Sequence, residues 1–352
     1  MTNNTKPSFA IYGQWRAVDI GNACLEVRLL PESGCDILNL VDLESGTDLL
    51  FKTPWAPGRR VPLASNSFTA WLEASSGGWN ILLPNGGDAA VESGVEWGFH
   101  GEAGRIEWAI KEIEASRARF ASELVTVPLE VEREISIDRN IVRIVELVTN
   151  TGCGRIEFMW GHHPSFGSPF LGPGCTIEVG ATTFVADLEN PGSCLKAGGE
   201  SEWPNASLAD GGSIDLSSFP NADAPRSVLG YLTEFVEPWF RFANPHTKLA
   251  ITVRWSAEVF PYAWFWQELH SSASFPWFGR AYASAIEPSS SFPAHGITRA
   301  RNSGSNLCVL EPGETREVTL EAEITHDGHL PRSGARPGGS KLEGGSSVVD
   351  GV

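Results

Sequence analysis

The chain has 352 residues, and its 26 Lys and Arg against 43 Asp and Glu give a net charge of −17. This negative charge disfavours nucleic acid and anionic membrane surfaces as partners. No apolar run approaches the ~18 residues of a membrane-spanning helix, and no basic segment followed by an apolar one marks a secretion signal. These features predict a cytoplasmic protein that acts on a small, uncharged molecule.

The composition favours strands over helices. With 37 Gly, 23 Pro and 13 Trp but only 2 Met, it is typical of many short strands joined by tight turns. The cysteines form no C-x-x-C pair, so we expect reduced and mostly structural thiols. They are Cys24, Cys35, Cys153, Cys175, Cys194 and Cys308.

Apolar and polar residues alternate in several segments in chain order. The clearest are residues 25–29, 131–137, 249–255 and 317–324. Such alternation predicts half-buried antiparallel strands, because successive side chains of a strand point to opposite faces. Residues 114–124 come closest to a helical pattern, but fit a strand and turn equally well.

No linker or internal repeat interrupts residues 1–325, which therefore predict a single all-β domain, a large antiparallel β-sandwich. From 326 to 352 the chain is rich in Gly, Ser and Pro and poor in large apolar residues. Such a segment buries too little surface to offset its chain entropy, so we expect a disordered tail.

Three clusters combine aromatic residues with histidines or carboxylates. The first, residues 77–102, contains His100 between glycine-rich stretches, and the second, residues 160–167, contains His162 and His163 directly after an expected strand. Neighbouring strand residues face opposite sides, so only one of these two histidines faces a given pocket. The third, residues 264–288, contains Glu287 after an apolar run. Indole rings with polar partners indicate a carbohydrate site; tryptophans that merely fill a core are the alternative.

The order of these motifs resembles that of aldose 1-epimerases (mutarotases) and of the galactose mutarotase-like superfamily. The resemblance rests on short motifs spread along most of the chain. They are LPESGCDI at 30–37, GGWNILLPNGGD at 77–88 followed by GFHGEA at 98–103, LVTN at 147–150, WGHHPSF at 160–166, AIEP at 285–288 and LEPGE at 310–314.

The resemblance implies a two-sheet β-sandwich that interconverts the α and β anomers of a free sugar without a metal or an organic cofactor. His163 would be the general acid at the ring oxygen and Glu287 the general base at the anomeric hydroxyl, with His163 protonated and Glu287 ionised at rest. His100 would bind or polarise the sugar near the same atoms. Glu268, in an equally aromatic setting, is the alternative base.

Further residues in these clusters are expected to contact the sugar. They are Trp79, Asn85, Asp88, Glu102, Trp264 and Gln267. His162 should face away if His163 faces the site. His270 and His295 are expected at the surface, although His295 could lie on a neighbouring loop.

Two departures from the family leave the identity of the sugar undetermined. Residues 63–88 contain no Arg, where the family usually has an Asn-Arg pair, and no substrate-binding Asp is evident between residues 230 and 250. The scarcity of basic residues favours a neutral sugar. The alternatives are a non-catalytic carbohydrate-binding protein and a lyase or hydrolase. Of these, a hydrolase would need two opposed carboxylates. A metal site is disfavoured because adjacent histidines diverge in a strand.

Overall fold

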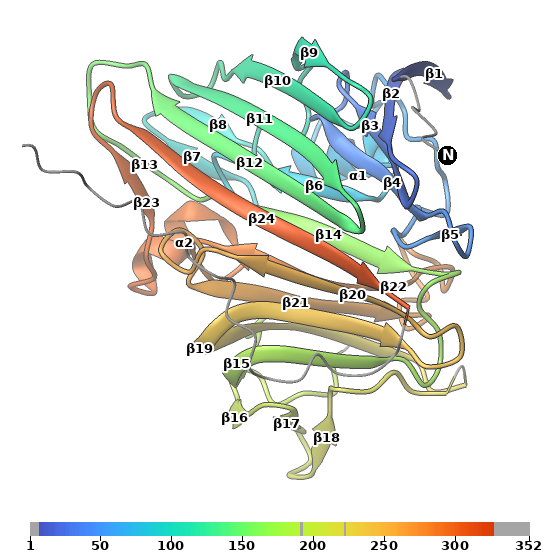
Figure 1. The fold of residues 1–352 in the computed structure, drawn as a ribbon. Coiled ribbons are helices and arrows are strands. Elements are labelled where there is room, and N and C mark those ends of the chain that lie inside the picture. The colour runs from blue at the N-terminus through green and yellow to red at the C-terminus, as the bar shows by residue number, and fades with distance from the viewer. Residues whose placement is uncertain (1–6, 191–192, 222, 327–352) are drawn as a thin grey trace, which may run out of the picture.

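Two layers of antiparallel strands face each other in the computed structural model, which describes residues 7–190, 193–221 and 223–326 (Figure 1). One layer runs through β9 (Ala109–Ile113), β10 (Arg117–Glu123), β11 (Leu129–Asp138), β12 (Ile141–Asn150), β24 (Thr315–Thr325) and β20 (Leu249–Trp255). The other runs through β1 (Ser8–Tyr12), β2 (Trp15–Gly21), β3 (Leu25–Leu30), β4 (Asp36–Asp42), β6 (Trp79–Leu82), β14 (Gly161–Gly167), β22 (Tyr282–Ser289) and β21 (Tyr262–Leu269).

One long strand, β19 (Arg226–Asn244), belongs to both layers. Its first part pairs with β21 and its last part with β20. Along its other edge it pairs with β15 (Thr176–Ala186), and β15 pairs in turn with β16 (Glu200–Glu202). Short strands complete the structure: β5 (Thr47–Asp48), β7 (Ala90–Glu92) with β8 (Val95–Trp97), β13 (Ile156–Phe158) with β23 (Cys308–Leu310), and β17 (Asn205–Ser207) with β18 (Ser213–Asp215).

The four strands predicted from alternation are confirmed as β3, β11, β20 and β24, and most of residues 114–124 lies in β10. Two short helices that the sequence analysis did not predict are also present, α1 (Ser67–Ala74) and α2 (Gly296–Asn302). Asn66 caps α1 by accepting a hydrogen bond from the Thr69 amide (2.9 Å). Helices of two turns are too short to show a clear apolar period.

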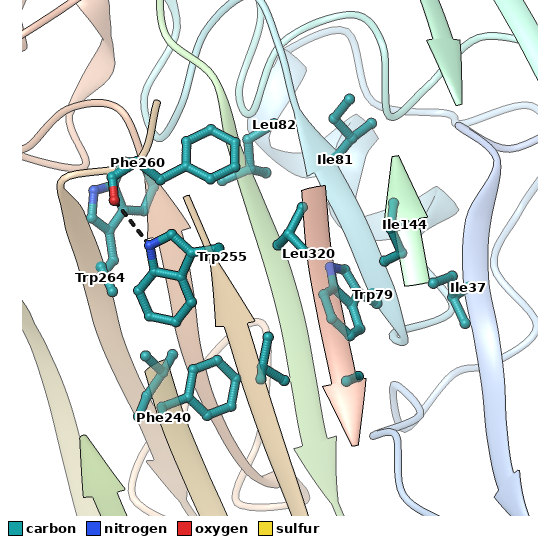
Figure 2. Packing of buried hydrophobic residues seen from close by; sticks show 14 of the residues in the cluster. Ile37, Trp79, Ile81, Leu82, Ile144, Phe240, Trp255, Phe260, Trp264 and Leu320 are labelled. Atoms are coloured by element: carbon teal, nitrogen blue, oxygen red, sulfur yellow. Dashed lines mark hydrogen bonds between the residues drawn. The ribbon is translucent and has the colours of Figure 1, made fainter. Parts of the chain in front are cut away.

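The core lies between the two layers (Figure 2). Trp79 and Ile37 of one layer and Ile144 and Leu320 of the other are all fully buried in one apolar cluster. All six cysteines are free. Three are buried, as expected, and three are exposed, which the sequence did not predict.

The predicted start of the tail follows the last strand directly. β24 ends at Thr325, and His326 Nε2 lies 3.0 Å from Asp42 Oδ1. Residues 327–352 of the predicted tail lie outside the described residues. In the described part of the chain, no helix combines the length and the apolar character needed to cross a bilayer.

Candidate active site

A cavity of about 690 Å³ opens on the face of the second layer that points away from the core. β6, β14, β21 and β22 form its floor, while α1 and the loops around residues 99–100, 271–277 and 294–295 form its walls. It brings together seven residues that the sequence analysis singled out, Glu268 and His295 among them. The other five are Asp88, His100, His163, Trp264 and Glu287.

Strand β14 separates its two histidines as the alternation predicts. His163 lines the cavity, whereas His162 is fully buried on the opposite face. His163 Nδ1 lies 2.9 Å from Ser165 Oγ, two residues along the same face. This contact holds the ring so that its Nε2 is directed toward Glu287.

Glu287 stands beside His163 on the neighbouring strand β22. Its Oε1 lies 3.5 Å from His163 Nε2. The side chain is almost completely buried, and in the described part of the chain its Oε2 has no hydrogen-bond partner. An unpaired buried carboxyl oxygen is costly, and since Glu287 lines the cavity, a ligand hydroxyl there would satisfy it.

His100 is the third ring of the site, and its centroid lies 5.6 Å from that of His163. Its backbone has φ +59°, a left-handed conformation uncommon outside glycine, and its side chain lines the cavity. The Gly87 amide donates to His100 Nδ1 (3.1 Å). Because Nδ1 accepts this bond, the ring proton sits on Nε2, which is therefore a donor for a ligand oxygen.

Gly87 is required at its position for two reasons. Its φ is +73°, and a Cβ there would come within 1.8 Å of the Ala294 carbonyl oxygen. Any larger residue would push apart the segments around Gly87, which holds His100, and Ala294.

Burial controls the protonation of the site. It raises the pKa of Glu287 well above its ordinary value and lowers the pKa of His163 to about 4. Burial, together with the charge of His163, also holds the pKa of His100 well below its ordinary value. The expectation of an ionised Glu287 and a protonated His163 at rest is therefore corrected, because desolvation favours the uncharged forms.

Glu268, the alternative base, has a different task. Its carboxylate accepts hydrogen bonds from the Ser271 and Ser272 amides (2.6 and 2.9 Å) and from Ser272 Oγ (2.5 Å). It therefore anchors the loop after β21. Trp264 pairs with Glu287 across the two strands, and Glu268 lies four residues further, about 13 Å at ~3.3 Å per residue. Its hydrogen bonds to the serines occupy the Glu268 carboxylate, which does not suit the free second carboxylate that a hydrolase needs.

Four of the predicted sugar contacts do not reach the cavity, since their side chains have other partners or face the core. Trp79 is buried in the core, where its Nε1 donates to His162 Nδ1 (3.1 Å). Asn85 donates to the Asp88 and Gly98 carbonyls and accepts from the Ile297 amide. Glu102 accepts from the Val125 and Thr126 amides. Gln267 is fully buried on the opposite face of β21 from Trp264 and Trp266.

The structure adds three indole rings that the sequence analysis did not select. Trp71, Trp266 and Trp277 all line the cavity. The Trp71 centroid lies 4.9 Å from that of His100, and the Trp266 centroid lies 5.9 Å from that of His163. The aromatic run after residue 264 was a signal for Trp266 and Trp277, whereas nothing near Trp71 marked it.

A charged network forms another wall of the cavity. His295 Nδ1 lies 2.9 Å from Asp88 Oδ2, and its Nε2 lies 2.9 Å from Asp187 Oδ2, which also accepts from the Tyr231 hydroxyl. The bonds to Asp187 and then Asp88 raise the pKa of His295 to about 10. His295 is thus a partly buried cation rather than a surface residue, and Asp187 has no sequence motif that would have revealed it.

A second polar cluster lies in the core beneath His163. Arg133 Nε donates to Glu146 Oε1 (2.6 Å), while Trp160 Nε1 donates to Glu146 Oε2 (3.1 Å). His162 Nε2 lies 3.2 Å from the same oxygen. Although burial opposes it, the charges of Arg133 and His162 and their hydrogen bonds lower the pKa of Glu146 to about 2. This cluster joins β11 and β12 of the first layer to β14 of the second.

Solved structures of low sequence identity share this fold. A protein of Escherichia coli K12 described as a "putative aldose 1-epimerase" is 18% identical, with 91% of this chain and 100% of that chain covered and a TM-score of 0.64. A galactose mutarotase-like protein from Lactobacillus casei is 16% identical, with 88% and 100% covered and a TM-score of 0.62. A galactose mutarotase related enzyme from Lactobacillus acidophilus is 14% identical, with 88% and 98% covered and a TM-score of 0.63.

These likenesses confirm the predicted fold class, a galactose mutarotase-like β-sandwich. A search of curated proteins finds no match to this chain. The model of one sequence family, described as a domain of unknown function (DUF4432), matches residues 14–324. Since this match spans most of the sequence, the chain belongs to the DUF4432 family.

Proposed function

We propose that this protein interconverts the α and β anomers of a neutral aldose, as an aldose 1-epimerase does. The observation that carries the proposal is Glu287 Oε2, a buried carboxyl oxygen at the cavity that has no partner among the described residues and belongs to a group 3.5 Å from His163 Nε2. Anomer exchange needs such a pair, because one proton must leave the anomeric hydroxyl while another reaches the ring oxygen.

The proposed reaction transfers two protons on ring opening and returns both on reclosure. Glu287, as carboxylate, takes the proton from O1, and His163, as imidazolium, gives its proton to O5 while the C1–O5 bond breaks. Rotation about C1–C2 in the open aldehyde exposes the other carbonyl face, and reclosure returns both protons. His100 Nε2–H would donate a hydrogen bond to a sugar oxygen and hold it in place.

The resting pair differs from the reacting pair only in where its proton lies. Burial favours a neutral Glu287 and a neutral His163, and the ion pair contains the same number of protons. Sugar hydroxyls that donate to the carboxylate would favour its ionised form, and the proton would then pass to His163. The proposal therefore needs no proton from solvent in each cycle.

The direct test is NMR magnetisation exchange between the α and β anomers of a panel of neutral aldoses. We expect the protein to accelerate exchange for at least one of them. Binding without acceleration would favour a non-catalytic carbohydrate-binding protein and would refute the proposed reaction.

The pH dependence of kcat/KM follows from the single proton that His163 and Glu287 share. Below His163's pKa of about 4, the pair takes up a second proton and has no base, so kcat/KM should fall with acid. At alkaline pH the pair loses its only proton through the raised pKa of Glu287, and the rate falls again. Between these two limbs we expect a plateau. An acid limb near the ordinary histidine pKa of ~6.5 would contradict this assignment.

A further inference from the structure

The cavity extends well beyond the three groups of the proposed reaction. His100, His163 and Glu287 line one part of it, and Glu287 pairs across the strands with Trp264. From there the floor continues along β21 to Trp266 and Glu268, the latter about 13 Å from Trp264 at ~3.3 Å per residue. The cavity of about 690 Å³ is therefore much larger than one sugar ring requires.

Two indole rings line this extension. The Trp266 centroid lies 5.9 Å from that of His163, and the Trp277 centroid lies 5.7 Å from that of Trp266. Trp55 stacks on Trp277 at 5.4 Å with an interplanar angle of 19°, and Phe51 meets it edge-on at 6.0 Å. These contacts hold Trp277 in place.

The loop that carries Trp277 is also fixed. Glu268 accepts hydrogen bonds from the backbone of Ser271 and Ser272 at the start of this loop. Further along, Phe275 contacts Phe68 of α1 across the cavity, with 6.3 Å between the ring centroids. A preformed aromatic surface binds a ligand ring with less loss of entropy than a mobile one.

The charge of the extension limits what it can bind. Among the described residues that line the cavity, none is Lys or Arg. The cation His295 is already paired with two carboxylates, Asp88 and Asp187. A phosphate or sulfate group would have no counter-ion here, whereas the apolar face of a neutral sugar ring suits an indole surface.

We propose that the substrate is a neutral reducing disaccharide or a longer oligosaccharide. Its reducing-end ring would lie at His163 and Glu287, and its next ring against Trp266 and Trp277. The inference rests on the proposed function, which places the free anomeric hydroxyl at Glu287. The second ring is then joined through one of the other hydroxyls of the reducing-end sugar.

The test compares each aldose with reducing disaccharides built from it: glucose with cellobiose and maltose, xylose with xylobiose, mannose with mannobiose, and galactose with galactobiose. Anomer exchange by NMR gives kcat/KM, and saturation-transfer NMR gives binding without catalysis. For at least one pair, we expect the disaccharide to exceed its monosaccharide about tenfold in kcat/KM, as one ring contact of this kind provides.

The Trp277→Ala variant should bring this disaccharide-to-monosaccharide ratio close to one, and Trp277→Phe should retain part of the preference. Phe278→Ala is the matched control, because Phe278 is an exposed ring of the same loop that is absent from the cavity lining. This control should keep the wild-type ratio, and thermal unfolding checks that all three variants are folded.

The outcomes separate the two proposals. Exchange without preference for any disaccharide, or a preference that survives Trp277→Ala, overturns the extended site and leaves the proposed reaction intact. Disaccharide binding that depends on Trp277 without any anomer exchange supports the extended site and refutes the reaction. If neither exchange nor disaccharide binding is observed, both are overturned.

Discussion

The Glu287→Gln variant should exchange anomers about 10³-fold more slowly than the wild-type protein, because the amide cannot take up the proton of the anomeric hydroxyl. Gln has nearly the same shape as Glu, so the cavity should keep its form. Burial already favours the uncharged carboxyl, and the variant should therefore be at least as stable as the wild type. NMR exchange rates at saturating sugar, together with thermal unfolding, measure both effects.

Glu268→Gln is the matched control for this experiment. Glu268 lies on the neighbouring strand and is also buried, but its carboxylate is occupied by Ser271 and Ser272. Its replacement should lower the rate far less, through a looser loop. Equal losses in the two variants, or a Glu287→Gln protein that keeps more than about a tenth of the wild-type rate, would remove Glu287 from the role of base.

The largest stability loss is expected from Glu146→Gln. The change removes the charge that balances Arg133, whose side chain is 2% exposed in the core. An unpaired buried guanidinium is strongly unfavourable, so we expect the free energy of unfolding to fall by about 3–5 kcal/mol. Urea unfolding at neutral pH measures this difference.

A surface ion pair provides the comparison. Arg254 Nη1 lies 3.1 Å from Glu323 Oε2, and both side chains are substantially exposed. Glu323→Gln should cost less than about 1 kcal/mol, because water and salt screen the pair. If Glu146→Gln cost no more than Glu323→Gln, the buried cluster would have no special role in stability.

Much of the fold could be predicted because its signal is local. Alternation in β11 and β24 is a property of neighbouring residues, and it survives in the structure as alternating burial. The opposite directions of His162 and His163 follow from the same rule. Applied to β21, this rule would also have excluded Gln267, which is an odd number of positions from Trp264 and so cannot share its face.

The errors at the site concern polar residues in loops. Asn85 and Glu102 lie near His100 in the sequence, yet their side chains bind backbone groups of other segments. No sequence pattern distinguishes a carboxylate that caps a loop from one that meets a ligand. The pairing of Asp187 with His295 joins residues 108 positions apart, and only the folded chain brings them together.

The opposed histidines of β14 also bear on how this protein can evolve. Inserting or deleting one residue in the strand would place His162 in the cavity and bury His163 against Glu146, because a shift of one position exchanges the faces of a strand. The core cluster and the cavity thus both fix which side chains of β14 face the core and which face the cavity. Length changes among relatives should therefore be confined to the loops at the cavity mouth, where new substrate preferences can arise without disturbing the floor.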